Sequence, residues 1–248
     1  MKFLRTSMLM LCALQASAAF ADLTSYSQNF ESMTISDGGA LASDGWLVYG
    51  NVFDPSNNYL YGYGSFPAPN GTGGFSSVAT GEGGPEQGLQ YINIFSDYNN
   101  GDHGNGNRIE ANVFREQAIG AGDLGTTFRF TFDYKASSMN GPGGATTTFA
   151  FIKVLNPGAG YATVANPTHE TTQAPTDSWI LGSSIDITID SGWSGHILQY
   201  GFVSNATRYE PSGVYYDNLS FAAVPEPSTV AAMLLGGVWL ASRSRRRK

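Results

Sequence analysis

The chain has 248 residues, with 31 glycines, 13% aromatic residues and only 13% charged residues, and its net charge is −7 at pH 7. Residues 22–223 carry 19 of the 20 acidic residues but only 6 of the 13 basic ones, so this region is strongly acidic. Such a surface repels phosphate backbones, which excludes nucleic acid as a partner. Abundant glycine and aromatic residues favour a β-fold with many turns.

The N-terminus has the three features of a secretory signal peptide. Lys2 and Arg5 provide positive charge, a short apolar core follows, and Ala19-Phe20-Ala21 fits the small-x-small cleavage rule. We therefore expect residues 1–21 to form a signal helix that is removed when the protein is exported. The only cysteine of the chain lies within this segment, so the mature protein has no disulfide and no cysteine-based metal site.

Two short motifs frame the mature region. Gln28-Asn29-Phe30-Glu31 and Asp44-Gly45-Trp46 stand near its start, and Tyr215-Tyr216-Asp217-Asn218-Leu219-Ser220-Phe221 stands near its end. This framing resembles that of jelly-roll carbohydrate-binding modules, although Gln28-Asn29 occupies the place of the usual Asn-Gly. The resemblance implies a structural calcium ion held by Glu31 and Asp217, and carboxylates are suitable calcium ligands. The alternative is that Glu31 accepts backbone N–H bonds and Asp217 caps a turn.

Three tyrosines alternate along the next part of the chain. Tyr59, Tyr61 and Tyr63 are spaced by two, so in an extended strand they would share one face. Exposed tyrosine rings stack on sugar rings, and this spacing predicts a ligand-binding platform. The alternative is that each tyrosine packs in the core or at its rim.

Eight segments read as β-strands because apolar and polar residues alternate along them. The clearest is Phe128-Arg129-Phe130-Thr131-Phe132-Asp133-Tyr134-Lys135, with its aromatic residues on one face. The predicted strands span residues 46–53, 89–95, 109–114, 128–135, 148–155, 185–190, 197–203 and 214–221.

Eight or more strands predict an all-β fold in which two antiparallel sheets pack as a β-sandwich, because one sheet cannot bury so many faces. The links between the strands vary in length, which favours a jelly roll over an up-and-down barrel. Residues 62–88 are glycine-rich and predict an exposed loop or a loosely paired edge, and residues 137–145 and 156–178 predict turns and loops.

The C-terminus has three parts. Pro225-Glu226-Pro227 interrupts regular structure, residues 230–241 read as a short hydrophobic helix, and residues 243–248 are rich in arginine. A basic cluster after an apolar helix stays on the cytoplasmic side of a membrane. With its flanks the apolar stretch has about 15 residues and is about 22 Å long as a helix, against about 30 Å for a bilayer core, so we expect it to span the inner membrane transiently.

This tail resembles the PEP-CTERM sorting signal of Gram-negative bacteria in its triplet, its hydrophobic helix and its arginine-rich end. The resemblance implies recognition by an exosortase and then transfer from the inner membrane to the cell surface or extracellular biofilm matrix. The alternative is an ordinary tail-anchored protein. The chain is therefore predicted to consist of a signal peptide (1–21), a β-sandwich domain (22–223) and a sorting tail (224–248).

No catalytic motif is complete in the mature region. The sequence lacks a phosphate-binding loop, a nucleophile elbow and the second histidine of a zincin helix. We expect a non-catalytic protein, not an enzyme, that contacts exopolysaccharide and has calcium as its only cofactor. Two alternatives remain open: a glycan-active enzyme on a jelly-roll scaffold, and a purely structural surface protein.

Overall fold

Strands form nearly all of the regular structure in this computed structural model, which describes residues 23–64, 76–95, 101–208 and 210–225. The helical elements are short: α1 (Ala40–Ser43), α2 (Gly101–Gly104), and the 3-10 turns η1 (Ala121–Asp123) and η2 (Pro157–Ala159). Within these described ranges, no helix is long and apolar enough to cross a membrane. The expected signal helix and the expected hydrophobic helix of the tail lie outside the described residues.

One sheet has six strands in the order β11-β7-β13-β5-β4, and β1 pairs with β13. Every pairing in this sheet is antiparallel. Its strands are β1 (Tyr26–Gln28), β4 (Ser77–Thr80), β5 (Gln90–Phe95), β7 (Thr127–Ala136), β11 (Ile180–Thr188) and β13 (Gly213–Ala223).

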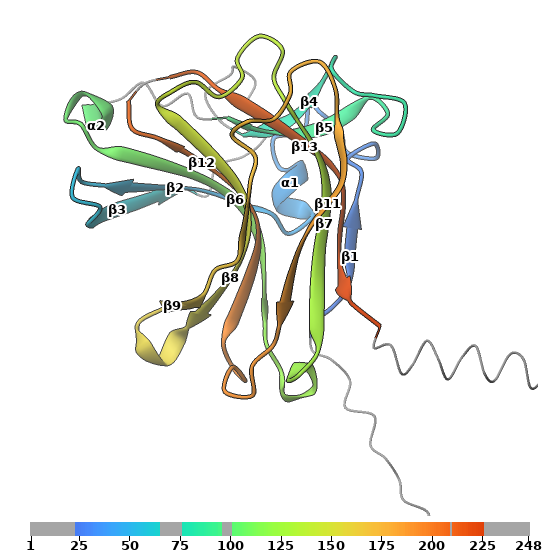
Figure 1. The fold of residues 1–248 in the computed structure, drawn as a ribbon, viewed down its shortest axis with the longest axis vertical. Coiled ribbons are helices and arrows are strands. Elements are labelled where there is room, and N and C mark those ends of the chain that lie inside the picture. Colours follow the sequence, from blue (N-terminus) through green and yellow to red (C-terminus); the bar gives the residue numbers. More distant parts are fainter. Residues whose placement is uncertain (1–22, 65–75, 96–100, 209, 226–248) are drawn as a thin grey trace, which may run out of the picture.

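The second sheet has seven strands in the order β10-β8-β12-β6-β2-β3, and β9 also pairs with β8. These pairings are antiparallel as well. Its strands are β2 (Leu47–Phe53), β3 (Tyr59–Gly64), β6 (Arg108–Ala118), β8 (Thr146–Asn156), β9 (Ala162–Ala165), β10 (Thr168–Glu170) and β12 (Ile197–Ala206). The two sheets pack against each other as layers (Figure 1), so the predicted all-β, two-sheet antiparallel sandwich is confirmed.

Alternation of side chains decides which face of each strand is buried. In β7, Phe128, Phe130 and Phe132 are at most 1% exposed, whereas Arg129 between them is exposed. A side chain on a strand points to the opposite face from its neighbours, so the three rings enter the space between the sheets together. Each large apolar side chain buried in this way contributes about 1.5–3 kcal/mol through the hydrophobic effect.

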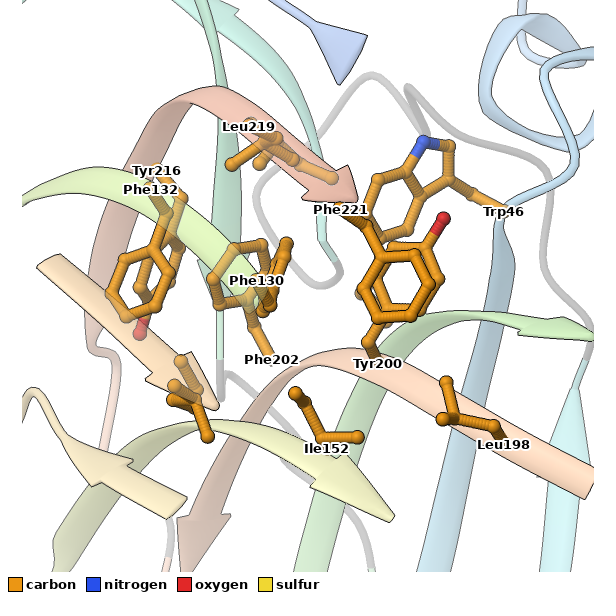
Figure 2. Close-up of a cluster of buried hydrophobic side chains, with 14 of the residues drawn as sticks. Trp46, Phe130, Phe132, Ile152, Leu198, Tyr200, Phe202, Tyr216, Leu219 and Phe221 are labelled. Atoms are coloured by element: carbon orange, nitrogen blue, oxygen red, sulfur yellow. The ribbon is translucent and has the colours of Figure 1, made fainter. Parts of the chain in front are cut away.

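Aromatic rings from the two sheets stack on each other in this core (Figure 2). Tyr200 of β12 and Phe221 of β13 lie 4.3 Å apart between ring centroids and are almost parallel, at 6°. Phe202 and Tyr216, from the same two strands, stack at 3.7 Å. All four rings are fully buried. Their stacking connects β12 of one sheet with β13 of the other across the core of the sandwich.

Four short strands lie at sheet edges that the sequence did not clearly mark. For residues 62–88 the sequence predicted either an exposed loop or a loosely paired edge strand. The region contains the end of β3 and all of β4, and β4 lies at the edge of its sheet, as the second of these predictions states. The prediction of turns and loops alone at residues 156–178 was wrong, because β9 and β10 lie there. These strands have three or four residues, and their pairing with β8 rests on backbone hydrogen bonds that need no alternating pattern.

Candidate functional site

The main hollow of the described residues lies on the outer face of the seven-stranded sheet. It has a volume of about 1050 Å³ and joins a smaller hollow of about 220 Å³, because Glu110, Asn112 and Lys153 line both. We refer to the two together as the groove. Its other lining residues include Tyr49, Asn51, Phe53, Tyr59, Phe114, Glu116, Phe149, Phe151, Leu155, Tyr161, Asn166, Thr168, Ile197, Gln199, Val203 and Asn205.

Strand alternation produces this face. In β2, Val48 and Val52 are buried in the sandwich, whereas Tyr49, Asn51 and Phe53 point to the other side and line the groove. The sequence therefore uses one set of positions for the core and the intervening set for the groove floor. The floor mixes aromatic and polar side chains, as ligand sites on proteins commonly do.

Two exposed tyrosines stand at opposite edges of the sheet and line the same groove. Tyr59 of β3 is 58% exposed and Tyr161, just before β9, is 60% exposed. The β2–β3 hairpin and β9 both project to the left of the sandwich in Figure 1, and the groove floor lies between them in the strand order. The two rings are therefore placed as walls on either side of the floor.

Tyr161 has a backbone conformation that tyrosine rarely adopts. Its φ angle is +62°, in the left-handed region, and Gly160 before it has a φ of +64°. A hydrogen bond from the Tyr161 backbone nitrogen to the carbonyl oxygen of Asn156, at 2.9 Å, closes this turn. A left-handed non-glycine residue costs about 1–3 kcal/mol, and such residues gather at functional sites. This geometry aims a large ring into solvent at the edge of the groove.

The tyrosine platform predicted from the alternation of Tyr59, Tyr61 and Tyr63 does not form as one face. The register of β2 and β3 shifts between Val52 and Phe53, so Tyr61 lies opposite Val52 but Tyr59 lies opposite Phe53. The irregularity turns Tyr59 to the groove side, where its ring contacts Phe53. Tyr61 and Tyr63 stay on the other face and contact each other, with ring centroids 6.2 Å apart.

The surroundings of Tyr61 and Tyr63 are those of structural residues. The Tyr61 hydroxyl donates to a carboxylate oxygen of Asp102, and the Tyr63 ring packs against a small buried cluster of Val52, Ile109 and Ala111. The structure therefore retains only Tyr59 of the three as a residue of the groove.

Glu110 is a fixed carboxylate in the groove floor. Its Oε1 atom accepts hydrogen bonds from Asn51 at 3.2 Å and Asn112 at 3.0 Å, and its Oε2 atom accepts one from Arg108 at 3.2 Å. Burial alone would raise the pKa of Glu110, but the positive charge of Lys153 and the donated hydrogen bonds outweigh it and lower the pKa. Glu110 is therefore ionised at neutral pH and holds both amides in place.

The two framing motifs meet in the structure, because β1 pairs with β13 and Gln28 lies opposite Leu219. Asp217 is fully buried there: its Oδ1 atom accepts from the backbone nitrogen of Asn218, and its Oδ2 atom has no hydrogen-bond partner. Burial raises the pKa of Asp217 to about 8, and the charges of Asp133 and Glu31 act in the same direction. We call Glu31, Asp133, Asp217 and Asn218 the Asp217 cluster.

The other two acids of the Asp217 cluster bind backbone and amide donors. Glu31 accepts from the backbone nitrogens of Leu89 and Gln90, at 2.7 and 2.6 Å, which is the alternative role considered for it. Asp133 accepts from Gly182, Gln87 and Asn218, at 2.7 to 2.8 Å. In the part of the chain that the structure describes, no three His, Cys, Asp or Glu side chains are grouped closely enough to hold a metal. Within the Asp217 cluster, the buried Oδ2 atom of Asp217 is left without a hydrogen-bond partner.

The predicted sorting motif begins close to the end of the sandwich. Strand β13 ends at Ala223, and the backbone nitrogen of Val224 still donates to Thr127 at 2.8 Å. Pro225 follows as the last described residue, and Glu226 and Pro227 lie outside the described residues.

The groove residues that sequence reasoning missed are Glu110, Lys153 and Tyr161. Glu110 and Lys153 stand at polar positions of predicted strands, where a solvent-facing charge is the ordinary expectation. Tyr161 follows Pro157-Gly158-Ala159-Gly160, a sequence typical of a tight turn. An aromatic residue directly after such a turn is the one local signal that could have identified Tyr161 as an exposed binding residue.

The sequence matches no protein-family model and no curated protein. Among solved structures, it is similar to one of the carbohydrate-binding modules from the β-sandwich superfamily, at 15% identity and a TM-score of 0.41, covering 79% of this chain and 60% of that one. It is also similar to TmCBM61 in complex with β-1,4-galactotriose (16% identity, TM-score 0.39, 79% of this chain and 94% of that one).

A third similar structure is the CBM22-1 xylan-binding domain of Xyn10C from Paenibacillus barcinonensis, at 10% identity and a TM-score of 0.42, covering 81% of this chain and 94% of that one. The chain thus spans 60% of the length of the first of these structures. Identities this low concern the fold alone.

Proposed function

We propose that the protein binds a glycan chain in the groove without cleaving it. The observation that carries this proposal is the placement of Tyr59 and Tyr161, each more than half exposed, on opposite walls of one groove. Tyrosine rings are apolar on their faces and polar at one end, so they suit sugar rings, which have apolar faces and hydroxyl rims.

The groove floor supplies the polar half of such a site. Asn51 and Asn112 both use their amide nitrogens on Glu110, so each has its amide oxygen left as an acceptor for sugar hydroxyls. A ligand that meets fixed hydrogen-bonding groups loses less free energy to ordering than one that meets mobile side chains.

The arrangement of acids in the groove supports binding over catalysis. Glu110 and Glu116 are the acidic residues that line the groove within the described ranges, and both lie on β6. Six residues of strand separate their backbones by about 20 Å, whereas the two carboxyl groups of a glycosidase stand about 5–9.5 Å apart. The lowered pKa of Glu110 also makes it a poor general acid.

We also propose that a calcium ion binds at the Asp217 cluster. A buried carboxylate oxygen without a hydrogen-bond partner is costly, and a cation would satisfy the Asp217 Oδ2 atom. Calcium takes six to eight oxygen ligands, so Asp217 and Glu31 would be completed by backbone carbonyl oxygens or water. The ion would supply a structural link between the strands that carry the two framing motifs.

For the whole chain we propose export, cleavage of residues 1–21, and temporary inner-membrane anchoring through the tail at 224–248. An exosortase recognising Pro225, Glu226 and Pro227 would then pass the sandwich to the cell surface or matrix, where exopolysaccharide is the glycan within reach. The support for this part is the sequence of the two ends, together with a domain that ends one residue before the motif.

We expect replacement of Tyr161 by alanine to weaken glycan binding about tenfold. Loss of one stacked ring removes about 0.5–1.5 kcal/mol in addition to the free energy of the area that it buries, and 1.4 kcal/mol corresponds to a factor of ten. A glycan array on the purified protein would identify a ligand, and calorimetric titration would measure its affinity for the wild type and the Tyr161→Ala variant.

Tyr61→Ala is the control, because Tyr61 is a 46% exposed tyrosine on the same hairpin as Tyr59 but lies on the other face of β3, away from the groove. Its affinity should equal that of the wild type. Equal binding by Tyr161→Ala and the wild type would contradict the assignment of the groove. Release of new reducing ends from the bound glycan would favour the alternative that the protein is a glycan-active enzyme. A glycan array on which no glycan binds would favour the alternative of a purely structural protein.

A further inference from the structure

Lys153 occupies the middle of the groove. Its neighbours on β8, Ile152 and Val154, are buried in the core, so the lysine points to the outer face. Its ammonium nitrogen lies 4.9 Å from the centroid of the Phe151 ring, and its side chain lines both the larger and the smaller hollow.

The ammonium group of Lys153 makes no direct ion pair or hydrogen bond within the described ranges, although its charge lowers the pKa of Glu110. No described carboxylate oxygen lies within 4.0 Å of it, and no described residue forms a hydrogen bond with it. The nearby acids already have donors: Glu110 holds Arg108 and two amides, and Glu116 accepts from Gln199 at 3.1 Å. Lys153 therefore keeps its N–H donors for a ligand at the place where the two hollows meet.

Further hydrogen-bonding groups line the smaller hollow beside Lys153. The side chains of Asn166, Thr168 and Asn205 line it, together with the rings of Phe149 and Phe151. The Oδ1 atom of Asn205 already accepts from Arg108 at 2.7 Å, so its amide nitrogen is left for a ligand. At about 220 Å³ this hollow is smaller than the sites of drug-sized ligands, which are about 300–1,000 Å³, and suits a single sugar unit.

We propose that the smaller hollow selects a sugar unit that carries a carboxylate, with Lys153 as its counter-ion. This inference rests on the proposed glycan binding and names the substrate class of the same groove. A charge-assisted hydrogen bond is about twice as strong as a neutral one, and a neutral sugar would leave the ammonium without an anion. Glu110 attracts Lys153 through space, but its own oxygens accept from Arg108, Asn51 and Asn112. It therefore leaves the N–H donors of the lysine for a sugar carboxylate.

The test compares glycans that differ only in this charge. Oligomers of galacturonate, mannuronate and glucuronate would each be titrated against the same oligomer with its carboxylates converted to methyl esters. We expect the best-bound acid to bind at least about tenfold more tightly than its ester, and its affinity to fall as salt is raised.

Two variants with equal change in net charge assign the preference to Lys153. Lys153→Met keeps the apolar stem over Phe151, and the ratio of acid to ester affinity should fall to about one. Arg129→Met removes a charge from the exposed outer face of the other sheet, where Arg129 pairs with Asp186, and should keep the ratio.

Each outcome of this comparison decides between the two proposals. Binding of esters as tightly as acids by the wild type, or an acid preference that persists in Lys153→Met, would overturn the inference and leave glycan binding intact. Failure of every acid and every ester, together with an empty glycan array, would overturn both.

Discussion

Replacing Phe221 by alanine is expected to lower the free energy of unfolding by about 3–5 kcal/mol, the usual cost of truncating a buried phenylalanine. Phe221 has no exposed surface and stacks on Tyr200 of the opposite sheet at 4.3 Å and on Phe128 of its own sheet at 5.4 Å. Its removal leaves a cavity at the centre of the sandwich, bordered by rings that cannot collapse into it. Chemical denaturation of the purified protein would measure the loss.

Met139→Ala is the control for this truncation, because Met139 is 85% exposed and its loss should change stability by no more than about 0.5 kcal/mol. A cost below about 1 kcal/mol for Phe221→Ala would mean that the two sheets do not meet through these rings. That result would contradict the packing of the two sheets described for the centre of the core.

Calcium is expected to stabilise the protein against unfolding by about 2.7–4.1 kcal/mol when present at a hundred to a thousand times its dissociation constant. The gain would come from the unpartnered Oδ2 atom of buried Asp217. Thermal unfolding in calcium and in chelator, near pH 8, would measure it. Asp217→Asn and Glu31→Gln should each abolish most of the response.

Asp177→Asn is a suitable control for these two variants, because Asp177 is an exposed acid outside the Asp217 cluster. It should keep the full response to calcium. An identical unfolding midpoint of the wild type in calcium and in chelator would contradict the proposed calcium site. It would not affect the proposal that the groove binds a glycan.

The proton on Asp217 gives a pH dependence that can be measured without calcium. Its pKa rises from 3.8 to about 8 on folding, so the folded protein retains a proton that the unfolded chain has released. In chelator, the stability linked to this proton is complete below pH 3.8 and is lost as the pH rises towards 8. The slope from this single group is at most about 1.4 kcal/mol per pH unit. The same slope in Asp217→Asn would contradict this assignment.

The sequence predicted the sandwich because its long strands carry a strict alternation of buried and exposed residues. Phe128, Phe130 and Phe132 show this directly, and each lies in the core. The edge strands β9 and β10 could not be predicted in the same way, since three or four residues held by backbone pairing leave no pattern in the side chains.

The groove was less predictable than the core, because it depends on contacts between distant strands. Glu110, Lys153 and Tyr161 come from two strands and a turn that are separate in the sequence, and only their pairing through β12 places them on one face. The shift that moves Tyr59 away from Tyr61 is a property of the β2–β3 register. A one-residue irregularity reverses a side chain, and spacing in the sequence does not reveal it.

The framing motifs at the two ends were predictable as neighbours, because first and last strands that pair bring their residues together. The pairing of Gln28 with Leu219 brings the two motifs together, and the charge of Glu31 acts on the pKa of Asp217. Whether the meeting point holds an ion depends on oxygen positions that the sequence does not specify.

Glycan binding in the groove is tested most directly by a crystal structure of the protein with its best-bound oligosaccharide. The account predicts a sugar chain lying along the outer face of the seven-stranded sheet, with rings against Tyr59 and Tyr161. An oligosaccharide bound anywhere else on the molecule, with the groove filled only by water, would contradict it.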